Sequence, residues 1–169
     1  EVYPSGQLPA GELGDASDLI GGAKLLMDAG FPEKGAAYLS GNIQQESGWN
    51  GQRTPWILND GAGTNKGLVS WNRTRITNAE RFLGKPLNEA SNAEQIRWIM
   101  HEMKNSYSDA YKVFMDPNAT DAQLETASYW YLGYGEVGER FRYAKEALMR
   151  LKRGEIGTYK QGIDIKLGT

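Results

Sequence analysis

Apolar residues recur at intervals of three and four along most of the chain, which is the spacing of amphipathic helices. This pattern predicts helices over residues 18–29, 32–47, 72–83 and 136–152. Ser91 with Glu94, and Thr120 with Gln123, have capping-box spacing and predict the starts of two further helices. Residues 50–70 are rich in Gly, Asn and Thr and predict a long loop with a short β-hairpin. The expected fold class is therefore mainly α, with this loop inserted after the second helix.

The helices are expected to form one domain. A chain of 169 residues is long enough to bury a sizeable core. We predict a compact domain over residues 18–153, preceded by a linker or arm at 1–17 and followed by a loosely held C-terminal tail at 154–169. Because the chain begins at Glu1 and not at methionine, we also expect that it was processed or excised from a longer protein.

Composition excludes several kinds of function. A net charge of -2 and an isoelectric point near 5.5 give no reason to expect nucleic-acid binding. The absence of cysteine excludes disulfides and thiol catalysis, and a single histidine, His101, leaves too few ligands for a typical zinc site. No apolar run approaches the roughly 20 residues that span a bilayer. We expect no metal, no cofactor and no membrane partner.

One acidic residue stands out because of its position on a predicted helix. Glu46 continues the apolar stripe of Ala36, Leu39 and Ile43, close to the end of that helix. Desolvation and the negative end of the helix dipole both disfavour an ionised carboxyl group there. A carboxyl group that keeps its proton suits a general acid that protonates a departing glycosidic oxygen. The alternatives are that Glu46 pairs with a lysine or arginine, or points into solvent because the helix ends earlier.

Two motifs carry a family resemblance. GNIQQESG at residues 41–48, followed by GLVSW at 67–71, resembles the phage tail lysozyme family, part of the lysozyme-like superfamily of goose-type lysozymes and lytic transglycosylases. The resemblance runs from about residue 20 to 151. It implies an α-helical lysozyme-like fold, peptidoglycan as the substrate and Glu46 as the catalytic acid. Ser70 stands where the family has glutamine, although its hydroxyl can still hydrogen-bond to sugar.

Further residues are expected at the site on this basis. Trp56 joins the tryptophans that flank the proposed site, and one of the aromatic residues at 129–134 is expected to touch glycan while the others are core. Arg140 and Arg142 meet wall carboxylates or, by default, are solvated helix charges. His101 and Glu102 are expected to form a surface or supporting pair. The predicted substrate contacts are Gln45, Ser47, Trp49, Ser70, Trp71 and Tyr131.

A second carboxylate would decide the chemistry. Asp60 is the best candidate because it lies in the loop expected to face Glu46, although Asp-Gly is also an ordinary turn sequence. An EF-hand is excluded because position twelve from Asp60 is Trp71. Without a second acid, the resemblance implies the lytic transglycosylase route, in which Glu46 acts first as acid and then as base.

The expected function is cleavage of the MurNAc-GlcNAc glycan strand of peptidoglycan by a muramidase or lytic transglycosylase. The resemblance further implies a larger phage tail protein or assembly as the partner, which carries the domain on the virion tail to the bacterial cell wall or periplasm. The alternative is a catalytically inactive module that binds glycan or supports the tail, with Ser70 as a trace of lost catalysis.

Overall fold

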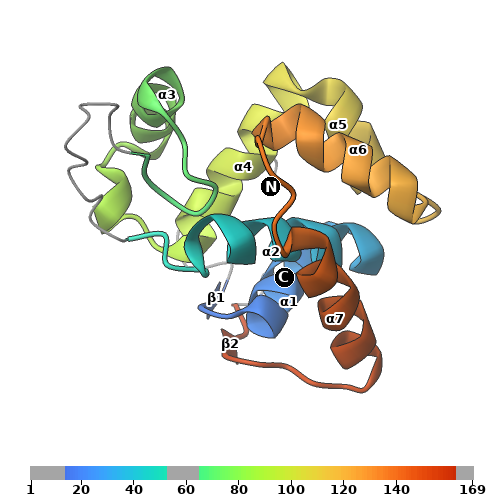
Figure 1. Cartoon of the computed structure of the whole chain (residues 1–169). Helices are drawn as coiled ribbons and strands as arrows, with labels where there is room; N and C mark the ends of the chain where they lie inside the picture. The colour runs from blue at the N-terminus through green and yellow to red at the C-terminus, as the bar shows by residue number, and fades with distance from the viewer. Residues whose placement is uncertain (1–13, 53–64, 163–169) are drawn as a thin grey trace, which may run out of the picture.

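The computed structural model describes residues 14–52 and 65–162, and the mainly helical prediction is confirmed (Figure 1). The helices are α1 (Leu19–Asp28), α2 (Glu33–Ser47), α3 (Arg73–Leu83), the 3-10 helix η1 (Leu87–Glu89), α4 (Asn92–Ser106), α5 (Ser108–Phe114), α6 (Asp121–Leu132) and α7 (Arg140–Lys152). Two short strands, β1 (Asp15–Ala16) and β2 (Tyr159–Lys160), complete the described elements.

Helix α2 lies at the centre of the molecule. Every residue from Gly35 to Ile43 is buried, so this stretch contacts protein on all sides and not only along the predicted apolar stripe. Helices α1, α5, α6 and α7 all pack against α2, while α3 lies apart from it across the molecule (Figure 1). Small residues make this arrangement possible, because they let neighbouring backbones approach the helix closely.

Helices α2 and α7 approach each other closely at Gly41. A Cβ atom added to Gly41 would lie 2.5 Å from the Arg140 carbonyl oxygen and 2.7 Å from the Ala144 backbone nitrogen. Both neighbours are backbone atoms of α7, so they cannot rotate away. Glycine at position 41 therefore fixes how near the start of α7 lies to α2.

Most helix starts follow the local sequence signals. Asp18 caps α1, and both capping boxes, Ser91 with Glu94 and Thr120 with Gln123, are formed as predicted. Local pattern was less informative at two other places. Helix α5 was not predicted. It follows α4 directly and is separated from it only by Tyr107, whose backbone is not helical (φ -138°, ψ 52°).

Helix α7 was predicted to start at about residue 136 but begins at Arg140. Gly138 has a φ of 60°, which is left-handed and interrupts a right-handed helix. Val137 accordingly lies outside the helix and is 47% exposed, although its spacing placed it on the apolar face.

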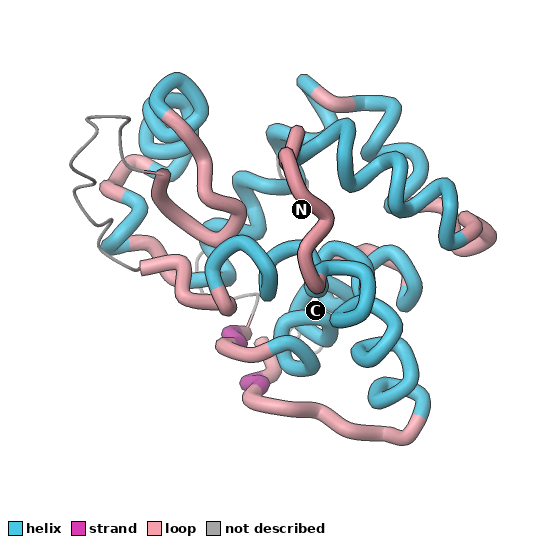
Figure 2. The backbone as a smooth tube through the Cα atoms, in the orientation of Figure 1, coloured by secondary structure: helices cyan, strands magenta, loops and turns pink. Residues whose placement is uncertain are grey.

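Part of the predicted C-terminal tail, residues 154–162, is described, and it contacts the rest of the domain. Strand β2 pairs antiparallel with β1, and Figure 2 shows the two strands together beside α1. The Asp18 carboxylate accepts the Gly21 amide at 2.8 Å and the Thr158 amide at 2.7 Å. Burial raises the pKa of Asp18, but these hydrogen bonds outweigh it and leave the pKa below its ordinary value. The start of α1 thus holds residues just before β2.

The long loop is described only at its ends. Lys66 and Trp71 form an isolated antiparallel bridge through their backbone groups, at 3.0 Å and 2.8 Å. This is the part of the predicted hairpin region that the structure describes. Among the described helices, none has the length and apolar character needed to cross a bilayer.

We predict that Gly41→Ala lowers the free energy of unfolding by about 1–3 kcal/mol, because the added methyl group forces α2 and α7 apart. Chemical denaturation measures the change. Gly135→Ala is the matched control, since a Cβ there would meet no atom within 4 Å. Equal stability of the two variants would show that the helices do not need this close approach.

Candidate active site

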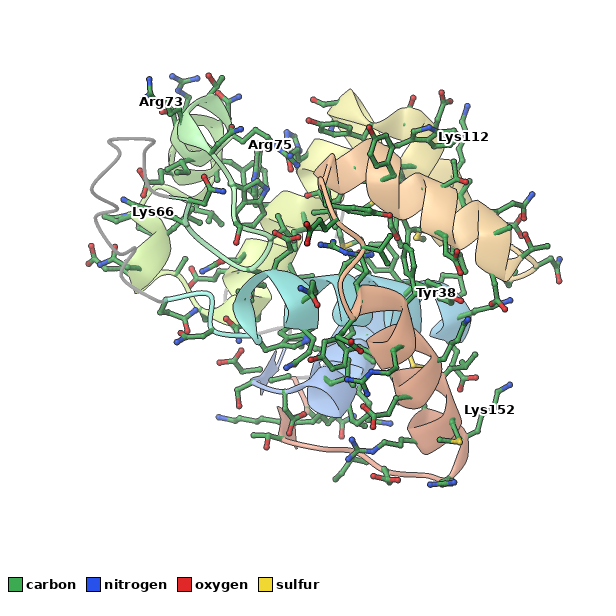
Figure 3. All side chains as sticks on the ribbon, viewed as in Figure 1. Tyr38, Lys66, Arg73, Arg75, Lys112 and Lys152 are labelled. Carbon is green, nitrogen blue, oxygen red and sulfur yellow. The ribbon has the colours of Figure 1, made fainter. Side chains whose placement is uncertain are left out.

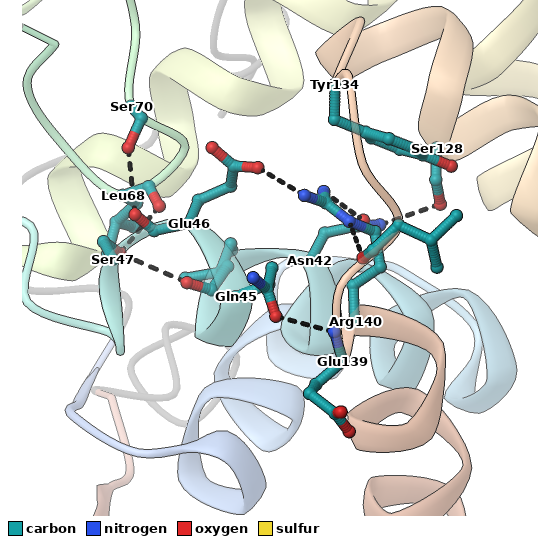
Figure 4. A network of polar contacts seen from close by, with 12 residues as sticks. Asn42, Gln45, Glu46, Ser47, Leu68, Ser70, Ser128, Tyr134, Glu139 and Arg140 are labelled. Carbon is teal, nitrogen blue, oxygen red and sulfur yellow. Dashed lines mark hydrogen bonds and ion pairs between the residues drawn. The ribbon is translucent and has the colours of Figure 1, made fainter.

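Glu46 lies in the last turn of α2 and is neither on the buried stripe nor fully solvated. Its side chain is 20% exposed, whereas Ile43, one turn earlier, is fully buried. The helix ends at Gly48, whose left-handed conformation (φ 61°) turns the chain, and the Gly48 amide donates to the Gln44 carbonyl. In Figure 4 the Glu46 carboxyl group extends between the 66–71 segment and the chain around Arg140.

The carboxyl group of Glu46 is paired with a buried arginine, which is one of the alternatives the sequence left open. Arg140 Nη2 donates to Glu46 Oε2 at 2.7 Å, and the Arg140 side chain is only 3% exposed. The arginine is thus not the solvated helix charge expected by default. The pair joins the last turn of α2 to the first residue of α7.

Other groups fix the guanidinium of Arg140 in place. Its Nε donates to the Val137 carbonyl at 2.8 Å and its Nη1 to Asn42 Oδ1 at 3.2 Å. The guanidinium also lies 3.9 Å from the ring centroid of Tyr134, a cation–π contact. Burial, partly offset by the charge of Arg140, raises the pKa of Tyr134. The guanidinium is therefore held by helix, loop and ring together.

Asn42 extends this network to α6. Its Nδ2 donates to Ser128 Oγ at 2.8 Å and to the Tyr38 carbonyl at 3.0 Å, and Ser128 Oγ donates to the Leu124 carbonyl. These groups are fully buried. The buried side-chain nitrogen and oxygen atoms of Asn42, Ser128 and Arg140 all have hydrogen-bond partners, so this network orients the guanidinium without leaving one of its own polar groups unsatisfied.

Two serines join the end of α2 to the 66–71 segment. Ser47 Oγ donates to the Leu68 carbonyl at 2.7 Å, and Ser70 Oγ donates to the Glu46 backbone carbonyl at 2.9 Å (Figure 4). Ser70 has a φ of 54°, so its backbone is in the left-handed region. The hydroxyl that stands in place of the family's glutamine therefore positions the backbone beside Glu46.

Gln45 lies on the opposite side of Glu46 and supports the start of α7. The Glu139 amide donates to Gln45 Oε1 at 2.9 Å, and Gln45 itself is exposed. A Cβ at Gly138 would lie 2.6 Å from the Gln45 amide nitrogen, so the glycine makes room for this side chain. Of the predicted substrate contacts, Gln45, Ser47 and Ser70 do gather around Glu46.

The predicted sugar-stacking aromatics lie in the core instead of on a surface. Trp49, Trp71 and Tyr131 are each 1% exposed. Trp49 Nε1 donates to Ser40 Oγ at 3.0 Å. Their ring faces are covered by protein and are not available to stack on a sugar in this structure. Asp60 and Trp56 lie outside the described residues.

Glu102, which the sequence predicted to form a surface or supporting pair with His101, is a buried acid. It is 4% exposed and accepts hydrogen bonds from Trp71 Nε1 at 3.0 Å and Tyr131 Oη at 2.7 Å. Arg75 binds it bidentately, with Nε to Oε2 at 2.6 Å and Nη2 to Oε1 at 2.8 Å. The Arg75 guanidinium also lies 5.0 Å from the Tyr107 ring and 5.1 Å from the Tyr131 ring.

These contacts explain why the two aromatic residues are in the core. Burial and the Glu102 carboxylate raise the pKa of Tyr131 well above its ordinary value, so its hydroxyl remains a donor. Although burial lowers the pKa of Arg75, its hydrogen bonds to Glu102 raise it overall. Glu102 thus joins α3, α4 and α6 behind the 66–71 segment. The sequence left open whether Glu102 lies at a surface or supports other residues. Only the positions of Arg75, Trp71 and Tyr131 in the structure identify its partners.

We predict that Glu102→Gln lowers the free energy of unfolding by about 2–4 kcal/mol. The neutral amide leaves Arg75 without its counter-charge and turns one donor toward the guanidinium. Urea denaturation measures the loss, with Glu136→Gln in the exposed chain before α7 as the control. Similar unfolding midpoints for both variants would contradict the role given to Glu102.

Comparison with known proteins assigns the chain to a family. The sequence model of the phage tail lysozyme family matches residues 22–151, well over half of the chain. No curated protein and no solved structure matches it. The matched range includes Glu46, Arg140 and the described part of the loop between them. On this match and its helical fold, the chain belongs to the phage tail lysozyme family, a group of lysozyme-like domains that act on peptidoglycan.

Proposed function

We propose that this domain cuts the MurNAc-GlcNAc glycan strand of peptidoglycan, with Glu46 as the proton donor. The observation that carries the proposal is the place of Glu46 in a chain of this family. Glu46 lies in the last turn of the central helix. Its carboxyl group is partly exposed and binds a buried arginine on one side. Family membership gives the substrate class, and the geometry gives an acid whose position is fixed.

The ion pair restricts which oxygen of Glu46 delivers the proton. Arg140 donates to Oε2, and Figure 4 shows the other carboxyl oxygen directed away from the guanidinium. A protonated Glu46 can still accept the Arg140 bond through Oε2 while Oε1 carries the proton. Arg140 then serves as a positioning residue that orients the acid.

Cleavage has two routes from this arrangement. In both, Glu46 gives its proton to the glycosidic oxygen as the bond from that oxygen to C1 of the sugar breaks. In a muramidase, Asp60 would act as the second carboxylate, about 5–5.5 Å from Glu46 as a nucleophile or 6.5–9.5 Å as a base for water. In a lytic transglycosylase, Glu46 takes a proton from the 6-hydroxyl, whose oxygen then bonds to C1 and closes an anhydro ring.

The setting of the reaction follows from the family. We infer that a larger tail protein or assembly carries the domain on the virion and delivers it to the cell wall or periplasm. A net charge of -2 gives the domain no overall attraction to an anionic wall, which is consistent with delivery by a larger particle.

One observation favours the second candidate, an inactive module that binds glycan or supports the tail. The carboxyl group of Glu46 already makes a salt bridge to a buried arginine, a contact that can serve to hold α2 and α7 together instead of catalysis. Ser70 also favours this candidate, because its hydroxyl donates to the Glu46 backbone carbonyl and is therefore already engaged within the protein. Activity measurements separate this candidate from the enzyme.

We predict that Glu46→Gln abolishes release of soluble fragments from purified peptidoglycan, with a rate loss of at least about 100-fold, because an amide has no proton to donate. The fold should persist, since glutamine still offers an oxygen to Arg140. Glu89→Gln, an exposed acid in η1, is the control and should cut normally.

Mass spectrometry of the fragments from the unmodified protein then separates the two routes. Anhydro ends indicate transglycosylation and reducing ends indicate hydrolysis. If the unmodified protein binds peptidoglycan but releases no fragments, the proposal of an enzyme is wrong and the inactive module stands.

We further predict that Arg140→Lys reduces the initial cleavage rate at least about tenfold, at a temperature where the variant is fully folded. Lysine keeps the charge but cannot reach Val137, Asn42 and Glu46 together as the guanidinium does. Arg142→Lys is the matched control on α7, because Arg142 is 62% exposed. A lower melting temperature with an unchanged rate would limit Arg140 to a structural role.

A further inference from the structure

A groove separate from Glu46 runs along the other end of α7. It has a volume of about 440 Å³. Its lining consists of one residue each from α2 and α6 and five on or just after α7: Tyr38, Asp121, Lys145, Leu148, Met149, Lys152 and Arg153. This volume lies within the roughly 300–1,000 Å³ of typical ligand sites. Arg140 and Lys152 are twelve residues apart on α7, so about 18 Å of helix separates the two ends. Figure 3 shows Tyr38 and Lys152 on the same side of the molecule.

The groove carries unbalanced positive charge. Among the described residues, no ion pair engages Lys145, Lys152 or Arg153, all of which line it. The lining acid, Asp121, is paired with Lys34 at 3.0 Å, and Lys34 together with the more distant charge of Lys145 lowers the pKa of Asp121. One carboxylate therefore faces three lining cations. This local excess of cations stands on a chain whose net charge is -2.

The helix dipole of α7 does not account for all three cations of the groove. Cations in the last turn of a helix interact favourably with its dipole, which accounts for Lys152 and the adjacent Arg153. Lys145 lies about two turns earlier, beyond the reach of that effect. By contrast, the α7 cations that point elsewhere, Arg142 and Arg150, have partners in Glu139 and Glu155.

The floor of the groove is apolar. Leu148 and Met149 line it, and Met149 is 49% exposed although it is a large hydrophobic residue. Tyr38 closes the base with a fully buried side chain whose hydroxyl has no hydrogen bond of normal geometry among the described residues. Burial and the nearby Asp121 carboxylate raise the pKa of Tyr38, so the hydroxyl remains protonated. A ligand here must combine negative charge with apolar surface.

We propose that this groove binds an acidic peptide with small apolar side chains and a free terminal carboxylate. Carboxylates match the unpaired lysines and arginine on the rim, and methyl groups match Leu148 and Met149 below. A sugar-phosphate polymer supplies the charge but little apolar surface, and a neutral glycan supplies no charge. The site lies apart from Glu46 and its occupancy does not depend on glycan cleavage.

The test uses the full chain and a fluorescent peptide, acetyl-Ala-Glu-Ala-Ala with a free C-terminus. Anisotropy should report saturable binding that weakens as salt increases. Lys145→Gln with Lys152→Gln should weaken binding at least about tenfold, and Lys145→Arg with Lys152→Arg should preserve it. Lys112→Gln is the matched control, because Lys112 lies on α5 outside the groove (Figure 3).

Defined results overturn the proposal. Equal binding by the double glutamine variant and the Lys112 control would show that the groove is not the site. Equal binding of the same peptide with glutamine for glutamate and an amidated C-terminus would show that the carboxylates are not recognised. Binding of inorganic phosphate with no binding of the peptide would assign the groove to a phosphate ligand instead.

A second arm identifies the source of the peptide without depending on catalysis. Glu46→Gln protein, which leaves the wall uncut, is sedimented with purified peptidoglycan and with glycan strands from which the peptides have been removed. Loss of sedimentation on stripped strands, and with the double glutamine variant, assigns the peptide to the wall. Binding of the soluble peptide without that loss would show that the wall peptide is not the occupant and would overturn that assignment. Both outcomes are independent of whether Glu46 cleaves glycan.

Discussion

Helices α2 and α7 meet backbone to backbone at Gly41, and the arrangement of the site depends on this contact. Because no side chain separates the helices there, the first residue of α7, Arg140, lies beneath the last turns of α2. Its guanidinium reaches Asn42 and Glu46 on one face of α2 and the Tyr134 ring on the other side. A wider separation would leave a cation buried without partners, at a cost of several kcal/mol. Packing and electrostatics therefore enforce the same geometry.

Two arginines, Arg140 and Arg75, are each held by a carboxylate and an aromatic ring. Arg140 is stacked on Tyr134 and paired with Glu46, and Arg75 is stacked on Tyr107 and Tyr131 and paired with Glu102. In each case an aromatic face and directed hydrogen bonds replace the water that the guanidinium loses. The two pairs differ in exposure. Glu102 is 4% exposed and Glu46 is 20% exposed, so the first stabilises the fold and the second can meet a ligand.

The aromatic residues near the site support it from the core and do not form a surface for sugar. Trp71 and Tyr131 donate to Glu102, and Trp49 donates to Ser40, so each anchors the framework behind the 66–71 segment. That segment is in turn joined to α2 through Ser47 and Ser70. The residues around Glu46 thus hold its backbone from one side and its carboxyl group from the other. Such a supported carboxyl group suits the positioning that general acid catalysis needs.

The sequence by itself determined the helical class, most helix starts and the place of Glu46 near the end of α2. These features depend on caps, glycines and spacing within a few residues, and a local pattern records them. Tertiary structure alone decided that Arg140 pairs with Glu46 from 94 positions away, that Trp49, Trp71 and Tyr131 are core, and that β2 pairs with β1. Periodicity tells which face of a helix is apolar, but not which charged residue of a distant helix will be buried against it. The spacing of Glu46 left open whether its carboxyl group would be shielded by apolar contacts or paired with a cation; the packing of α7 at Gly41 placed Arg140 beside it.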